Sequence, residues 1–238
     1  MKNIYSPVPK VLIFTGNFGS GKSEIAVNYT LFLNEKNSNT TIIDLDIIKP
    51  YFRCREATEL LRRKGVRVVI PEGERRYADL PILVPEIKGL IQSPSGYTIL
   101  DVGGEDTGAR VLSYFQEAFQ VLDQYELFLV VNRNRPFTGD LDGVLKMLGM
   151  IEKASGLKVT HLISNNHLLE ETDLDTVVSG YELTKAASEK TGIPIFLVGV
   201  PDHLMEKAQE KIPDTPLLSI QRILLPPHLM HKKARWLV

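Results

Sequence analysis

Residues 16–23 of the chain read GNFGSGKS and have the residue types and spacing of a phosphate-binding loop. The pattern is G-x-x-x-x-G-K-S, in which glycines let the backbone wrap closely and direct its N–H groups at phosphate oxygens. Lys22 is expected to reach the β- and γ-phosphates, and the Ser23 hydroxyl is expected to ligate Mg²⁺. A helical pattern follows and adds the positive end of its dipole. The motif therefore predicts the binding of a nucleoside phosphate together with Mg²⁺.

Aspartates that end apolar, strand-like runs could serve the same site. Asp44 and Asp46 end the run TTIIDLD, and Asp101 lies near the end of the run YTILDVGG. Ligands of open α/β sheets bind outside the carboxyl ends of the strands, so these carboxylates are expected beside Mg²⁺ and an attacking water. Asp101 should hold the metal directly or through water. Gly104 should offer its N–H to the γ-phosphate, because it has no side chain to block the approach.

These motifs need elements that bring them to one edge of a sheet. Strands are expected at 10–15, 40–45, 66–70, 97–102, 126–132, 158–164 and 194–199, and helices at 22–35, 53–64, 84–92, 109–121, 140–154, 173–192 and 203–210. Continuous apolar strands that alternate with helices are typical of a parallel sheet buried on both faces. The pattern predicts a three-layer α/β/α fold with a mostly parallel, twisted sheet of about seven strands. Together with the GNFGSGKS motif, this arrangement resembles the P-loop NTPase fold.

The chain is interpreted as one nucleotide-binding domain, residues 1–212, followed by a tail, residues 213–238. The tail leaves the alternating pattern and carries basic residues near Trp236, so it is expected either to pack on the domain or to dock a partner. The segment 71–82 is charged and contains prolines, which predicts a surface loop.

Composition narrows the class of protein. The 238 residues are 43% hydrophobic and 24% charged, which is ordinary for a soluble globular protein. A net charge of −1 gives no electrostatic reason to expect nucleic acid or an anionic membrane as partner. No apolar run approaches the roughly 18 residues of a membrane span. The single cysteine, Cys54, cannot form an internal disulfide, and a cytoplasmic location is expected.

GNFGSGKS, DLD and DVGG at these spacings resemble the MinD/ParA/CobQ group of P-loop NTPases, over most of residues 9–201. The group belongs to a larger class, SIMIBI, that also holds signal-recognition GTPases, nitrogenase iron protein and dethiobiotin synthetase. The resemblance implies that Asp46 positions or activates the attacking water and that Asp101 is the Walker B carboxylate.

The chain departs from this group inside the phosphate-binding loop. The group's loop reads GKGGxGK[ST], and its signature lysine reaches the nucleotide across a sandwich dimer. Here Asn17 takes the place of that lysine, and Phe18 replaces a glycine. The departure argues against ATP-driven dimerisation of the ParA type, and a homodimer stays an open alternative. Lys49 or Arg53 is a candidate source of the missing charge; a solvated loop is the other interpretation of their segment.

The residues expected to contact the base favour adenine. GTPases of this class carry N-K-x-D after the strand predicted at 158–164, and this chain has NNHL there. In the related ATPases an asparagine at this place hydrogen-bonds adenine, which implies that role for Asn165. Pro201 and Asp202 resemble the family loop that lines the base. The segment 132–135, NRNR, also opens at this edge, either to contact a substrate or partner or as an ordinary polar loop.

We therefore predict a Mg²⁺-dependent ATPase that acts as a nucleotide-driven switch and binds ATP or ADP, with Lys22 and Asp46 as catalytic residues. The expected nucleotide-binding residues are Gly16, Asn17, Phe18, Gly19, Ser20, Gly21, Lys22, Ser23, Glu24, Gly104, Asn165, Pro201 and Asp202, and the expected metal ligands are Ser23, Asp46 and Asp101. The alternatives are a small-molecule kinase or ligase of the dethiobiotin-synthetase or cobyrinate-synthase type, a GTPase, and a nucleotide-binding module that does not hydrolyse. The identity of a protein partner or small-molecule substrate is left open.

Overall fold

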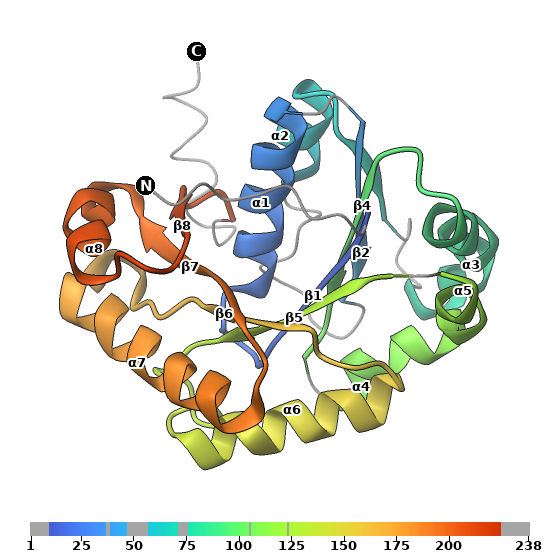
Figure 1. The fold of residues 1–238 in the computed structure, drawn as a ribbon. Helices are drawn as coiled ribbons and strands as arrows, with labels where there is room; N and C mark the ends of the chain where they lie inside the picture. Colours follow the sequence, from blue (N-terminus) through green and yellow to red (C-terminus); the bar gives the residue numbers. More distant parts are fainter. Residues whose placement is uncertain are drawn as a thin grey trace.

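A parallel β-sheet forms the centre of the molecule in the computed structural model, which describes residues 10–36, 39–46, 57–70, 76–104, 106–122 and 124–224 (Figure 1). Its strands are β1 (Val11–Thr15), β2 (Thr40–Leu45), β3 (Arg67–Val69), β4 (Tyr97–Val102), β5 (Glu126–Val131), β6 (His161–Ser164), β7 (Ile195–Pro201) and β8 (Leu217–Ile220). Within the described ranges the sheet has eight strands in the order β3-β2-β4-β1-β5-β6-β7-β8. The predicted three-layer fold with a parallel sheet is confirmed.

Helices cover both faces of this sheet (Figure 1). The helices are α1 (Lys22–Lys36), α2 (Thr58–Arg63), α3 (Arg76–Gln92), α4 (Asp106–Arg110), α5 (Gln116–Val121), α6 (Leu141–Ser155), α7 (Leu174–Thr191) and α8 (Met205–Lys211), with short 3₁₀ turns η2 (Val111–Phe115), η3 (Leu169–Glu171) and η4 (Asp202–Leu204). Helices α1 and α2 pack on one face, and α3, α5 and α6 pack on the other. Among the described residues, no helix combines the length and the apolar character that crossing a membrane requires.

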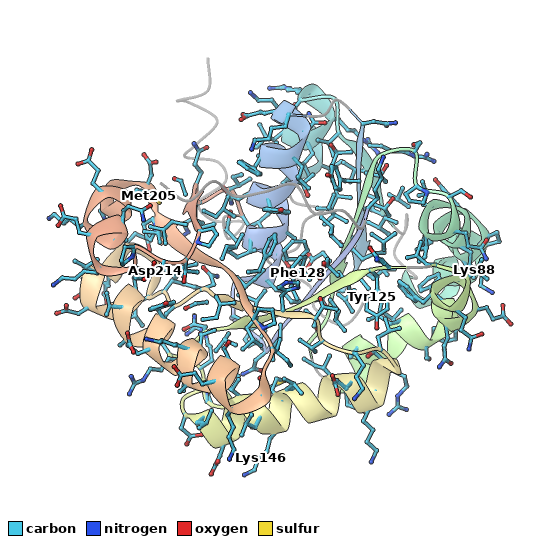
Figure 2. All side chains as sticks on the ribbon, in the orientation of Figure 1. Lys88, Tyr125, Phe128, Lys146, Met205 and Asp214 are labelled. Atoms are coloured by element: carbon cyan, nitrogen blue, oxygen red, sulfur yellow. The ribbon has the colours of Figure 1, made fainter. Side chains whose placement is uncertain are left out.

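The side chains of β1 alternate between the two faces of the sheet, which explains why its sequence is a continuous apolar run. Val11 and Ile13 belong to the core cluster on the α6 face, whereas Leu12 and Phe14 belong to the cluster on the α1 face. Successive side chains of a strand point to opposite faces, so a strand covered on both sides is apolar throughout. Phe128 lies near the middle of the molecule, with its ring centroid 4.8 Å from that of Phe14 (Figure 2).

Capping residues mark both ends of α6 and α7, the two longest described helices after β5. Asp140 accepts a hydrogen bond from the backbone N–H of Gly143 at 2.8 Å, and Asp173 accepts one from Thr176 at 2.8 Å. Each side chain satisfies an N–H that has no partner within the first turn of its helix. Gly156 and Gly192 end the same helices in the left-handed conformation, which glycine adopts without steric cost.

Strand β8 was not predicted. Its residues pair in parallel with β7, with Pro201 opposite Ile220, so the sheet extends beyond residue 212, where the sequence analysis ended the domain. After β8 the chain crosses α1, where Asn28 and Gln221 exchange hydrogen bonds at 2.9 Å in both directions. The basic stretch near Trp236 lies outside the described residues.

Other boundaries also differ from the prediction. Helix α3 begins at Arg76, so the expected surface loop at 71–82 is wrong over its second half. The expected helix at 109–121 is divided among α4, η2 and α5, and the expected strand at 158–164 is limited to β6. Lys49, Arg53 and Cys54 lie outside the described residues.

Candidate functional site

The phosphate-binding loop leaves the sheet at the point where its strand order reverses. Strand β1 lies between β4 and β5; the chain moves from β1 to one side for β2, and later crosses β1 to reach β5. Crevices at such points are the usual ligand sites of open α/β sheets. The loop itself is tightly turned: the N–H of Ser20 donates to Asn17 O at 3.0 Å, and Gly19 and Gly21 have φ values of +73° and +80°. Both glycines adopt a backbone conformation that other residues rarely tolerate.

A buried ion pair occupies the inner side of the loop. Lys22 Nζ lies 2.8 Å from Asp46 Oδ2, and both side chains are almost fully buried. Burial alone would lower the pKa of Lys22, but the negative charges of Asp46, Asp101 and Asp44 outweigh it and raise that pKa. Asp44 supports the arrangement, because its Oδ1 accepts the backbone N–H of Asp46 at 3.0 Å. The lysine is therefore held as a cation among carboxylates.

Asp101 has a strongly perturbed pKa. It lies opposite Asp44 in the register of β2 and β4 and is fully buried. Burial raises its pKa to about 7, with further increases from Asp44 and Asp46, although Lys22 opposes the shift. A carboxyl group with this pKa in the absence of ligands is one that gains from an added positive charge.

The oxygens around Asp101 fit a magnesium ion. Within the described part of the chain, neither Asp101 carboxylate oxygen nor Ser23 Oγ makes a hydrogen bond of good geometry, although the hydroxyl is near enough to favour the charged form of Asp101. Buried polar atoms without hydrogen-bond partners are costly, so atoms of this kind are suited to bind a cation. Mg²⁺ prefers hard oxygen ligands and commonly takes only one or two carboxylates, completing its shell with water and substrate phosphates. Among the described residues, no group of three or more His, Cys, Asp or Glu is placed to bind a metal by itself.

The loop after β4 touches the phosphate-binding loop. A methyl group added to Gly104 would overlap the carbonyl oxygen of Gly16, so only glycine fits between the two loops. Thr15 Oγ1 donates to Gly103 O at 3.3 Å, and a methyl group on Gly103 would lie 3.2 Å from Asp46 Oδ1. The structure therefore brings the predicted glycine, lysine and aspartate residues into one site.

Several side chains in the predicted set have partners that the sequence did not indicate. Asn17 is buried, and its Oδ1 accepts the N–H of the next residue, Phe18, at 2.7 Å, so its side chain is bonded within the loop itself. Phe18 is 57% exposed. The carboxylate of Glu24 accepts the N–H groups of Ile223 at 2.6 Å and Leu224 at 3.2 Å, which ties the chain after β8 to the start of α1.

The residues predicted to contact the base lie at the same edge of the sheet, with contacts of their own. The Asn165 amide donates to Ser20 O at 2.8 Å and so supports the phosphate-binding loop from outside. Pro201 ends β7, and Asp202 Oδ1 accepts the hydroxyl of Ser219 at 2.8 Å. Their contact with a base stays a prediction. One further residue, Arg135, contacts the loop; its place in the NRNR segment was noticed in the sequence, but its partner was not.

Comparison with protein-family models and with curated proteins found no match. Solved structures of FtsY, in contrast, share the fold. FtsY from Mycoplasma mycoides matches with a TM-score of 0.56 at 16% identity, covering 83% of this chain and 62% of that one. Chloroplast FtsY from Physcomitrella patens matches with a TM-score of 0.54 at 18% identity, covering 84% and 61%. The signal recognition particle receptor FtsY from Elizabethkingia anophelis, in complex with GDP, matches with a TM-score of 0.52 at 16% identity, covering 84% and 60%.

The chain spans about three fifths of the length of these FtsY structures. At 16–18% identity the likeness is one of fold alone. A shared fold is compatible with the larger class that the motifs resemble. It does not single out the MinD/ParA/CobQ group within that class.

Proposed function

We propose that this chain binds a nucleoside triphosphate with Mg²⁺ and hydrolyses it, as a nucleotide-driven switch. One observation carries the proposal: Lys22 and Asp46 form a buried ion pair inside a glycine-rich loop, beside buried Ser23 and Asp101 oxygens that lack good hydrogen bonds within the described residues. In such a site the Lys22 ammonium group can bind phosphate oxygens, and the Ser23 and Asp101 oxygens can bind a hard cation. Within this class of proteins, the sequence motifs favour the MinD/ParA/CobQ group.

The chain's own residues suggest how hydrolysis would proceed. Phosphate oxygens entering the loop compete with Asp46 for Lys22, because they concentrate more negative charge near the ammonium group. Asp46, once separated from Lys22, can orient a water and accept its proton as the water attacks the γ-phosphate in line. Ser23 and Asp101 would hold Mg²⁺, which when bound neutralises charge on the phosphate oxygens.

ATP is the preferred substrate in this proposal. The segment 165–168 lacks the Lys and Asp of N-K-x-D, so no carboxylate stands where that motif reads guanine. GTP is the second candidate, since one FtsY structure that shares the fold is a complex with GDP.

A binding competition tests the choice of nucleotide. The purified chain is titrated with ATP, ADP and GTP in the presence of Mg²⁺, and phosphate release is followed with and without a chelator. We expect ATP to bind more tightly than GTP by about tenfold, the worth of one or two hydrogen bonds to the base edge. Removal of Mg²⁺ should abolish turnover.

Tighter binding of GTP would make the second candidate the correct one, and no binding of any nucleotide would refute the proposed function. Assays at two protein concentrations address dimerisation, because specific activity that rises with concentration indicates that a second copy completes the site.

Asp46→Asn should separate binding from hydrolysis. The amide keeps the shape of the side chain but cannot accept the proton of the attacking water. Turnover should fall by about 10²–10⁴, the usual worth of a general base, while ADP affinity changes by only a few fold. Asp142→Asn on α6, which replaces an exposed carboxylate, should leave turnover unchanged. If Asp46→Asn hydrolyses at the normal rate, the water is activated by another group.

A further inference from the structure

The loop between β5 and α6, residues 132–140, makes hydrogen bonds to the phosphate-binding loop. Arg135 Nε donates to the carbonyl oxygen of Gly19 at 2.7 Å. The amide of Asn132 lies 3.4 Å from the same oxygen and 3.4 Å from the carbonyl oxygen of His167. The loop therefore connects the phosphate-binding loop to the segment that follows β6.

This outer loop is itself held in one shape. Thr138 is fully buried, and its hydroxyl donates to Asn132 O at 2.7 Å. The N–H of Thr138 donates to Arg135 O at 3.1 Å, and the N–H of Asn134 donates to Asn132 Oδ1 at 2.9 Å. Arg135 is half-buried, and its Nη1 donates to Asn134 O at 3.0 Å. Contacts within the chain thus aim the guanidinium group at Gly19.

The geometry of a phosphate-binding loop explains what such a contact does. Because the loop directs its N–H groups inward at phosphate, its carbonyl groups face outward and need partners elsewhere. A charged donor makes a shorter and stronger hydrogen bond than a neutral one and pulls electron density toward the carbonyl oxygen. The neighbouring N–H groups then become better donors to an anion.

Gly19 and Arg135 also fit each other sterically. A side chain at Gly19 would overlap Arg135 Nε, so the arginine occupies space that only glycine leaves open. Gly19 has a φ of +73°, and the bond from Arg135 holds its carbonyl in the orientation that this conformation produces. Asn165 makes a similar contact with the next residue of the loop, because its neutral amide donates to the carbonyl oxygen of Ser20.

We propose that Arg135 is a positioning residue, which holds Gly19 so that the N–H groups of the phosphate-binding loop face a nucleotide before it arrives. The inference rests on the proposed nucleotide binding. Arg135 acts through the backbone of Gly19, and its own contact with phosphate is not required.

The test compares Arg135→Ala and Arg135→Lys with the control Arg133→Ala in the full chain. Arg133 is exposed in the same loop and makes no hydrogen bond or ion pair with a described residue. Arg135→Ala should lose at least about tenfold in ADP affinity, with KM for ATP raised and kcat lowered by less than about threefold. Arg135→Lys should recover part of the affinity, since an ammonium group can still donate to Gly19 O. Arg133→Ala should bind ADP within about twofold of the wild type.

A second measurement uses nucleotide-free protein, in which amide hydrogen exchange of residues 16–22 should become faster in Arg135→Ala alone.

Equal ADP affinity and equal exchange in Arg135→Ala and the wild type would overturn the inference while leaving the proposed function intact. An equal loss of affinity in Arg133→Ala would also overturn it, because the effect would then be one of general charge. If the wild type binds no nucleotide, the proposed function fails instead, and the exchange of residues 16–22 alone decides the role of Arg135. Should Arg135→Ala not fold, Arg135→Gln replaces it as the neutral variant.

Discussion

Replacing Lys22 by alanine is expected to abolish measurable hydrolysis and, in addition, to destabilise the nucleotide-free protein. Lys22 faces Asp44, Asp46 and Asp101, and its ion pair with Asp46 is buried. Removing one partner of a buried ion pair leaves an uncompensated charge, which typically costs about 3–5 kcal/mol of unfolding free energy. Turnover should fall by about 10³ or more, because in the proposed mechanism the same ammonium group stabilises the γ-phosphate in the transition state. Denaturant unfolding without nucleotide and a phosphate-release assay measure the two effects.

A double variant separates these two roles of Lys22. In Lys22→Ala/Asp46→Asn the carboxylate that Lys22 pairs with is also neutralised, so part of the lost stability should return while turnover stays absent. The coupling between the two substitutions gives the pair's interaction energy. If Lys22→Ala unfolds with the same free energy as the wild type, the ion pair contributes nothing in solution, and the observation that carries the proposed function loses its weight.

The placement of GNFGSGKS, Asp46 and Asp101 at one edge of the sheet could be predicted because each depends on local sequence. GNFGSGKS contains its own turn, and Asp46 and Asp101 follow strands whose apolar runs identify them. Parallel pairing then brings the carboxyl ends of β1, β2 and β4 to one edge, whatever connects them. For the same reason the three-layer fold was predictable from the alternation of strands and helices.

The partners of individual side chains were not predictable, since they depend on loops that meet only in three dimensions. Asn165 was placed correctly after β6, but its amide donates to Ser20 O, a contact that no local pattern encodes. Arg135 stood in a segment that reads equally well as a polar surface loop. Its bond to Gly19 requires that β5 lie next to β1, which strand order in the sequence does not reveal.

Short and proline-containing elements were missed for a related reason. Strand β8 is only four residues long and follows Pro213 and Pro216, so its sequence resembles that of an extended tail. Pairing with β7 is what makes it a strand. Helix α3 contains Pro81 and Pro85, which remove N–H donors and usually indicate a helix end. Tertiary context outweighs these local preferences.

Asp101→Asn is expected to stabilise the nucleotide-free protein at pH 8 and to remove one source of its pH dependence. Burial, aided by Asp44 and Asp46, raises the pKa of Asp101 from 3.8 to about 7 in the folded protein. Between these pH values the folded state binds a proton that the unfolded chain has lost. The free energy of unfolding therefore falls as pH rises through this range, by at most about 1.4 kcal/mol per pH unit from this group. Above pH 7 the carboxyl group is ionised in both states, and the buried charge lowers the free energy of unfolding by its full amount.

Urea unfolding of the wild type and Asp101→Asn from pH 5 to pH 8, without nucleotide or Mg²⁺, measures this contribution. His167, whose pKa is lowered to about 4 by burial and by the nearby arginines Arg135 and Arg222, adds a slope of the opposite sign, and the difference between the two proteins removes it. The stability difference should grow in favour of the variant as pH rises, while affinity for nucleotide with Mg²⁺ falls. Equal slopes in the two proteins would mean that Asp101 titrates normally. A growing difference would instead show that the free protein is destabilised by a buried carboxylate whose charge becomes favourable only when a cation binds beside it.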